Sequence, residues 1–157
     1  MEQTNEVVER LKKLVGDKIV EIKSPRRRRI FLRVEKESFR EAVKEIVNDM
    51  KITHLSTITG TDLGQEIELL YHFAYGDLTV LTVGFKIPKD NLNVRTLTDL
   101  VPGAILYERE LHEVLGVNFE GHPGLLPLIL PETWPEGVYP LRKEQKFEDL
   151  RKISSKS

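Results

Sequence analysis

The sequence predicts an α+β domain of two layers, in which helices cover one face of a mixed or antiparallel sheet. Three segments have the apolar spacing of amphipathic helices, and five short segments have the composition of strands. Their order along the chain is helix, two strands, helix, three strands, helix. The 157 residues are the length of one domain, and a chain of this size buries roughly 70% of its unfolded surface.

Two helices are predicted in the first third of the chain. Residues 4–15 carry apolar side chains at helical spacing, and Thr4 is placed to cap this helix. Residues 38–50 carry one continuous apolar stripe, and Ser38 and Glu41 have the spacing of a capping box. Both helices therefore have one face to bury against a sheet.

A run of four arginines at residues 26–29 lies between the predicted strands at 18–23 and 29–35. The run contains no aromatic residue, and the whole chain has 24 basic and 25 acidic residues. A nucleic-acid site typically shows a basic excess on one face or a recognisable binding motif. We therefore interpret the run as a solvated hairpin tip that keeps the sheet edge soluble.

Three further strands are predicted at residues 53–60, 66–75 and 78–87. The last two flank Gly76 and Asp77, a pair that suits a tight hairpin turn. A final amphipathic helix is predicted over residues 104–115, and Gly116 is a natural residue to end it.

The chain is predicted to divide into a core domain over residues 1–116, an extended arm over 117–145 and a polar tail over 146–157. The arm is rich in proline and glycine and lacks regular periodicity, yet it carries many apolar residues. It is too apolar to be disordered, so either the core or a partner must cover it. Trp134 lies between two prolines, which fits an interface anchor and equally fits packing against the sheet.

The composition excludes several kinds of site in this chain. There is no cysteine, which excludes disulfides, thiolate-bound zinc and iron–sulfur clusters ligated by its own thiolates. No apolar run has the length of a membrane span and the first residues are acidic, so we expect a cytoplasmic location. Abundant lysine and glutamate with little glutamine and methionine indicate a thermophilic, even hyperthermophilic, source.

The last predicted helix carries a dense cluster of charged side chains away from its apolar face. The i, i+4 spacing lets Glu108 meet His112 and Arg109 meet Glu113 on the helix surface. Three interpretations stay open: a solvated face, a charged docking surface, or a metal site that Glu108 and His112 form with His122. The third interpretation would make the chain a stand-alone metal-dependent hydrolase.

One long pattern runs from this cluster to the end of the arm. It consists of Glu108, Arg109, Glu110, Gly116, Val117, Phe119, Gly121, His122, Pro123, Leu125, Pro140, Leu141, Arg142 and Lys143. In this order and spacing the residues resemble the signature of the 30-kDa subunit family of respiratory complex I, which also occurs in membrane-bound nickel–iron hydrogenases. A Pro-Gly-Ala sequence before the helix and the sequence LLYHFAY upstream extend the resemblance over roughly residues 50–145.

The resemblance implies a non-catalytic peripheral subunit on the cytoplasmic side of a membrane-bound oxidoreductase. Such a subunit holds no cofactor; its partners are a large catalytic subunit and a small iron–sulfur subunit, which carry the nickel–iron site and the clusters. Membrane subunits of these complexes couple the redox reaction to ion transport. The hydrogen-evolving hydrogenase branch is favoured because Glu113 lies in a hydrogenase-like HEVLG sequence, where most of the family has aspartate. The alternative is the equivalent subunit of a quinone-reducing complex I.

The resemblance also predicts which residues meet the partner subunits. They are Glu108, Arg109, Glu110, Glu113, Gly116, Phe119, Gly121, His122, Pro123, Leu125, Trp134, Pro140, Leu141, Arg142 and Lys143. Leu126 and Pro127 stand where the family has paired arginines. We therefore expect the partner of this chain to differ most from its relatives at that point.

Overall fold

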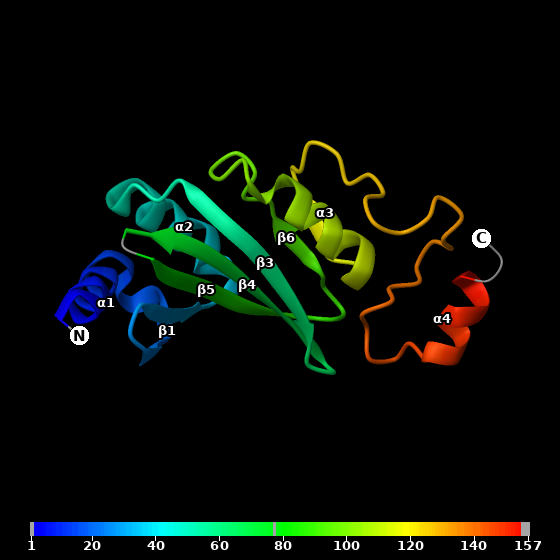
Figure 1. Cartoon of the computed structure of the whole chain (residues 1–157), viewed down its shortest axis with the longest axis horizontal. Helices are drawn as coiled ribbons and strands as arrows, with labels where there is room; N and C mark the ends of the chain where they lie inside the picture. The colour runs from blue at the N-terminus through cyan, green and yellow to red at the C-terminus, as the bar shows by residue number, and fades with distance from the viewer. Residues whose placement is uncertain (1, 77, 155–157) are drawn as a thin grey trace.

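The computed structural model describes residues 2–76 and 78–154 and contains a mixed sheet of five strands. The strands are β1 (Ile19–Arg26), β2 (Arg29–Val34), β3 (His54–Asp62), β4 (Glu66–Tyr75) and β5 (Thr79–Pro88). They lie in the order β1-β2-β5-β4-β3, with β2 and β5 parallel and the other neighbours antiparallel (Figure 1). Both predicted hairpins, β1–β2 and β4–β5, are present, although Asp77 of the second turn lies outside the described residues.

Three helices, α1 (Glu2–Val15), α2 (Lys36–Met50) and α3 (Ala104–Leu115), pack on one face of this sheet. A short 3-10 helix (Gly16–Lys18) follows α1. Phe39 of α2 contacts Tyr71 of β4, and α3 lies over Gly60 of β3. Gly60 pairs with Leu69, which points to the same side of β4 as Tyr71, so α2 and α3 share a face. The predicted α+β class, with helices on one face, is confirmed.

The core lies between the helices and the covered face of the sheet. Phe39 packs against Tyr71 and Phe85, with ring centroids 4.7 and 4.2 Å apart. Alternate side chains of the two central antiparallel strands are at most 1% exposed: Ile67, Leu69, Tyr71, Phe73, Leu81, Val83, Phe85 and Ile87. Full burial of one large apolar side chain contributes about 1.5–3 kcal/mol, so this cluster is the main source of stability.

A close approach between α3 and the sheet depends on Gly60. A Cβ atom at this position would lie 2.4 Å from Leu115 Cδ1 and 2.8 Å from Leu111 Cδ2. Two leucines of α3 therefore fill the space that any other residue at position 60 would occupy. This contact fixes the position of α3, and α3 in turn carries the residues that the arm contacts.

Two local predictions differ from the structure. Helix α2 begins at Lys36 with Glu35 as its N-cap, and no side chain caps it, so the capping box predicted from Ser38 and Glu41 is wrong. Ser38 instead donates its backbone N–H to Glu35 O at 3.1 Å, inside the first turn. The extended conformation of Glu35 starts the helix earlier than the side-chain pattern indicated.

A second, two-stranded sheet was not predicted. Strand β6 (Asn93–Arg95) pairs in parallel with β7 (Asn118–Glu120), which lies at the start of the predicted arm. Each strand has three residues, which is too short to show a periodicity in the sequence. The pair buries Val94 and Phe119 and joins the beginning of the arm to the core.

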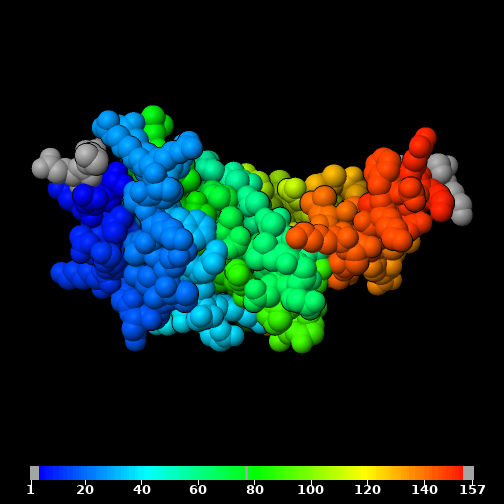
Figure 2. All heavy atoms as spheres, turned by 90° about the horizontal axis from the view of Figure 1, so that it is seen from below, coloured from blue at the N-terminus to red at the C-terminus, as the bar shows by residue number. Residues whose placement is uncertain are grey.

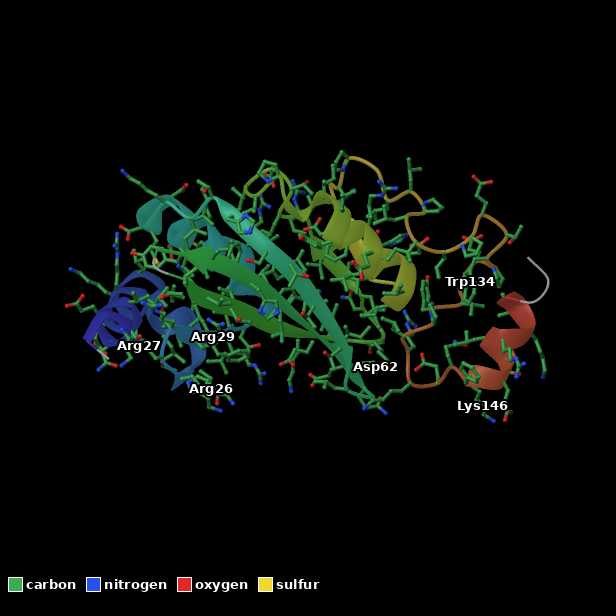
Figure 3. The ribbon with its side chains drawn as sticks, viewed as in Figure 1. Arg26, Arg27, Arg29, Asp62, Trp134 and Lys146 are labelled. Atoms are coloured by element: carbon green, nitrogen blue, oxygen red, sulfur yellow. The ribbon has the colours of Figure 1, made fainter. Side chains whose placement is uncertain are left out.

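The arginine run and the C-terminal segment lie at opposite ends of the molecule (Figure 3). Residues 26–29 form the β1–β2 turn as predicted, and in the described part of the chain none of these arginines makes an ion pair. Figure 2 shows the orange and red C-terminal segment extending beyond the body of the molecule. It ends in α4 (Phe147–Ser154), within the tail that the sequence indicated as polar.

Candidate interaction surface on helix α3 and the arm

The inner side of α3 contains a buried glutamate. Ala104, Glu108, Leu111 and Leu115 lie at helical spacing and face the core, and Glu108 has no exposed surface. The sequence analysis placed Glu108 on the charged side of the helix, away from the apolar face, and this is wrong. Its carboxylate accepts the Leu97 N–H at 2.8 Å and the hydroxyl of Thr96, so the turn before α3 supplies the partners that burial requires.

The environment of Glu108 changes its proton affinity. Burial raises the pKa of Glu108 to about 7, although the hydrogen bonds from Leu97 and Thr96 favour the ionised form. The Tyr71 hydroxyl nearby has no hydrogen-bond partner within the described residues. Burial, and then the charge of Glu108, raise the Tyr71 pKa well above its ordinary value. A glutamate that titrates near neutral pH therefore lies directly beneath α3.

The outer side of α3 holds the main chain of the arm. Arg109 donates from Nε to Leu126 O at 3.0 Å and from Nη2 to Pro127 O at 2.7 Å. The Glu113 carboxylate accepts the three successive N–H groups of residues 128–130 at 2.8–3.1 Å. We call Arg109 and Glu113 the main-chain clamp. The predicted Arg109–Glu113 ion pair does not form, because both side chains bind the arm instead.

His122 fixes the turn at the beginning of the arm. Its Nε2 donates to Ile105 O at 2.9 Å, and its Nδ1 accepts the Gly124 N–H at 3.0 Å. Because a carbonyl oxygen only accepts and an amide N–H only donates, these partners place the ring proton on Nε2. Gly121 has φ +82°, a conformation that favours glycine. His122 thus orients a turn, which is the role that the sequence favoured over proton relay.

Residues 140–143 close the C-terminal end of α3. Leu141 N donates to Val114 O at 3.1 Å, and Arg142 Nε donates to Leu115 O at 2.8 Å. The Arg142 guanidinium also stacks over the Tyr139 ring, 4.3 Å from its centroid. Gly116 ends the helix with φ +75°, and a Cβ there would lie 2.5 Å from Arg142. The glycine and the arginine of the sequence pattern are therefore parts of one contact.

A buried aspartate that the sequence analysis left without a partner holds the end of the arm. Asp62, at the end of β3, accepts the Lys143 N–H at 2.7 Å and pairs with Lys89 at 2.6 Å. Lys89 also pairs with Glu144 at 2.7 Å. Burial raises the pKa of Asp62, but the bonds from Lys89, Lys143 and Gly64 outweigh it and lower the pKa to about 2. We call this group the Asp62 latch; its members are far apart in sequence, so no local pattern indicated it.

The other predicted interface residues are divided between the interior and the surface. Phe119 is buried, whereas Glu110, Leu125, Trp134 and Pro140 are half-buried. Trp134 donates from Nε1 to Val138 O at 2.8 Å and lines a hollow within the arm. The side chains of Leu126, Leu128, Ile129 and Leu141 remain exposed. The core therefore covers part of the arm and leaves its aliphatic side chains in contact with solvent.

The residues proposed for a metal site are not brought together. His112 Nδ1 donates to Val117 O at 2.8 Å, whereas Glu108 points into the core. His122 uses both ring nitrogens for backbone groups. The described part of the chain contains no group of three His, Asp or Glu side chains that could hold a metal ion. The ligand set on which the hydrolase interpretation depended is therefore not formed.

In the described chain no helix is both long and apolar enough to span a bilayer.

Comparison with known proteins gives the chain relatives of one kind. It is 34% identical over 126 residues to a subunit of the F(420)H(2) dehydrogenase of Methanosarcina mazei, covering 78% of each chain. It is 34% identical over 124 residues to the membrane-bound hydrogenase subunit beta of Pyrococcus furiosus, covering 76% of this chain and 72% of the relative.

A solved structure of the membrane-bound sulfane sulfur reductase, an archaeal respiratory membrane complex, contains a chain of the same fold. The two share 28% identity with a TM-score of 0.82, over 99% of this chain and 92% of the other. The sequence profile described as the 30 Kd subunit of the respiratory-chain NADH dehydrogenase matches residues 32–150. The match includes most of the sheet, α3, the main-chain clamp and the arm, and the chain therefore belongs to the family of the respiratory-chain NADH dehydrogenase 30-kDa subunit.

Proposed function

We propose that this chain is a non-catalytic peripheral subunit of a membrane-bound multisubunit oxidoreductase. One observation carries the proposal: α3 holds the main chain of the arm, while the aliphatic side chains of the arm are left uncovered. A segment that is ordered by polar bonds and has exposed apolar side chains is suited to pack on another protein. The relatives named above are subunits of such complexes, which supports the same role here.

In this proposal the redox groups belong to the partners. A large subunit would hold the nickel–iron site or its counterpart, and a small subunit would hold the iron–sulfur clusters. This chain would dock the two subunits through α3 and the arm, on the cytoplasmic side of the membrane. Its described residues offer backbone-directed anchors rather than reactive groups, which fits a structural role.

Among the possible complexes we propose a hydrogen-evolving nickel–iron hydrogenase first. The support is the HEVLG sequence at Glu113 and the similarity to the hydrogenase subunit beta. The equal identity to an F(420)H(2) dehydrogenase subunit and the close overlay on a sulfane sulfur reductase chain give the rival complexes. The family itself also includes the complex I type, which reduces quinone.

Affinity purification from the native membranes tests the proposal. A tag at the N-terminus is suitable because α1 lies at the end of the molecule opposite the arm (Figure 1). We expect the tagged chain, extracted in a mild detergent, to bring down a large subunit and an iron–sulfur subunit with stoichiometric nickel and hydrogen evolution from a reduced donor. Reduction of quinone or of polysulfide without nickel would replace the hydrogenase with a rival complex. Recovery of the chain alone would overturn the proposal.

A further inference from the structure

The segment of residues 126–130 has a fixed main chain and free side chains. Five hydrogen bonds from the main-chain clamp hold it, and all five go to backbone atoms of the segment. Leu126, Leu128 and Ile129 are 66%, 39% and 57% exposed. Charged groups therefore hold the segment in one conformation without covering its aliphatic side chains, so little further ordering is needed when a partner binds.

Helix α3 adds two aliphatic side chains to this surface. Ile105 and Leu106 are 39% and 51% exposed, although they lie on a helix of the core domain. The Ile105 carbonyl receives the bond from His122, and Arg109 lies one turn further along the same helix. We call Ile105, Leu106, Leu126, Leu128 and Ile129 the apolar ridge. It follows the line along which the arm rests on α3.

The charges around the ridge are acidic. Between residues 104 and 139 the basic side chain is Arg109, which is bound to backbone carbonyls, whereas the acidic ones are Glu108, Glu110, Glu113, Glu120, Glu132 and Glu136. Within the described residues, Glu110, Glu132 and Glu136 form no ion pair. An acidic rim is repelled by an anionic lipid surface and by a second copy of the same rim.

We infer that the apolar ridge inserts into an apolar recess of another protein subunit whose rim carries lysine and arginine. The inference rests on the proposed function and names the chemistry of one partner surface within the complex. Aliphatic side chains that enter a recess supply the binding energy, and the acidic rim selects the orientation. A lipid surface and a second copy of this chain are the two occupants that the charge argues against.

Site-specific photo-cross-linking within the native complex tests the inference. p-Benzoylphenylalanine is placed at Ile129 in the tagged chain, and the matched control places it at Val20 of β1, which is 53% exposed on the far edge of the sheet. We expect Ile129 to cross-link to one peptide of another subunit that is rich in apolar residues and flanked by lysine or arginine. The Val20 position should not label that peptide.

The outcomes separate the inference from the proposed function. If the complex co-purifies but Ile129 labels lipid, a second copy of the chain, an acidic peptide or nothing, the inference is wrong and the proposed function stands. If the wild-type chain brings down no redox subunit, both are wrong.

A charge substitution gives a second, independent measurement. Ile129→Glu would bury an unpaired charge in the recess, so we expect at least a tenfold loss of co-purified partner. Val20→Glu, an exposed aliphatic position with no role in the ridge, should leave the yield unchanged. Both variant chains should melt within a few degrees of the wild type, because neither side chain is buried. An unchanged partner yield with Ile129→Glu would overturn the inference.

Discussion

The sheet and the arm contain similar amounts of aliphatic character but are held in opposite ways. In β4 and β5 the apolar side chains are buried beneath α2 and α3, and the backbone bonds are made within the sheet. In the arm the backbone is bound by side chains of the core, and the aliphatic side chains stay exposed. The sheet therefore forms a stable core without a partner. The arm has its conformation set in advance and its hydrophobic surface still available.

The difference lies in which atoms each anchor contacts. Arg109, Glu113, Arg142 and Asp62 all bind backbone groups in or beside the arm. Bonds of this kind fix the path of the chain whatever side chains it carries. Residues 126–130 can therefore vary in side chain, as at the Leu126–Pro127 departure from the family pattern, while the path of the arm is kept.

The largest effect is expected from the core. Phe39→Ala should lower the free energy of unfolding by about 3–5 kcal/mol, because it opens a cavity between Tyr71 and Phe85. Trp134→Ala in the arm should lower it by about 1 kcal/mol or less in the free chain, since that side chain is only half-buried. Urea unfolding followed by circular dichroism measures both. Equal losses would show that the arm is part of the cooperative core and break the comparison.

The second effect concerns the foundation on which the arm rests. Glu108 has a folded pKa of about 7 against an ordinary 4.5, so the folded state binds its proton more tightly. The stabilisation that protonated Glu108 provides is fully present below about pH 4.5 and is lost as the pH rises to about 7. The difference between the two pKa values corresponds to roughly 3 kcal/mol.

Glu108→Gln should remove this pH dependence. The amide oxygen still accepts from Leu97 and the amide nitrogen donates to Thr96, so the variant should be more stable than the wild type at pH 8. Urea unfolding at pH values from 4.5 to 8 compares the two proteins. Parallel stability curves across that range would contradict the assignment.

The third and smallest effect concerns the end of the arm. Asp62→Asn should cost roughly 2 kcal/mol at pH 7, because the charge that pairs with Lys89 is lost. The folded pKa of Asp62 is lowered from 3.8 to about 2, so its contribution is full above about pH 3.8 and is lost as the pH falls toward 2. Variant and wild type should therefore converge in stability at low pH.

The local consequence of Asp62→Asn is measured by hydrogen exchange. The Lys143 amide should exchange faster in the variant, because its acceptor is weakened. Asp99→Asn is a suitable control, since Asp99 pairs with Arg40 on the surface and is half-exposed. If the two variants lose equal stability and neither affects Lys143, the latch does not hold the arm.

The sequence by itself determined the elements whose residues lie close together in the chain. The stripe of α2, the β4–β5 hairpin, the end of α3 at Gly116 and the family pattern were all readable from local spacing, because helix and hairpin geometry relate residues a few positions apart. Tertiary structure alone decided the inward position of Glu108, whose hydrogen-bond partners Thr96 and Leu97 lie on another segment. It also decided that Asp62 binds Lys143 and that Glu113 binds the arm instead of Arg109. A polar side chain satisfies its hydrogen bonds with whatever the fold brings near, and that choice is not recorded in local spacing.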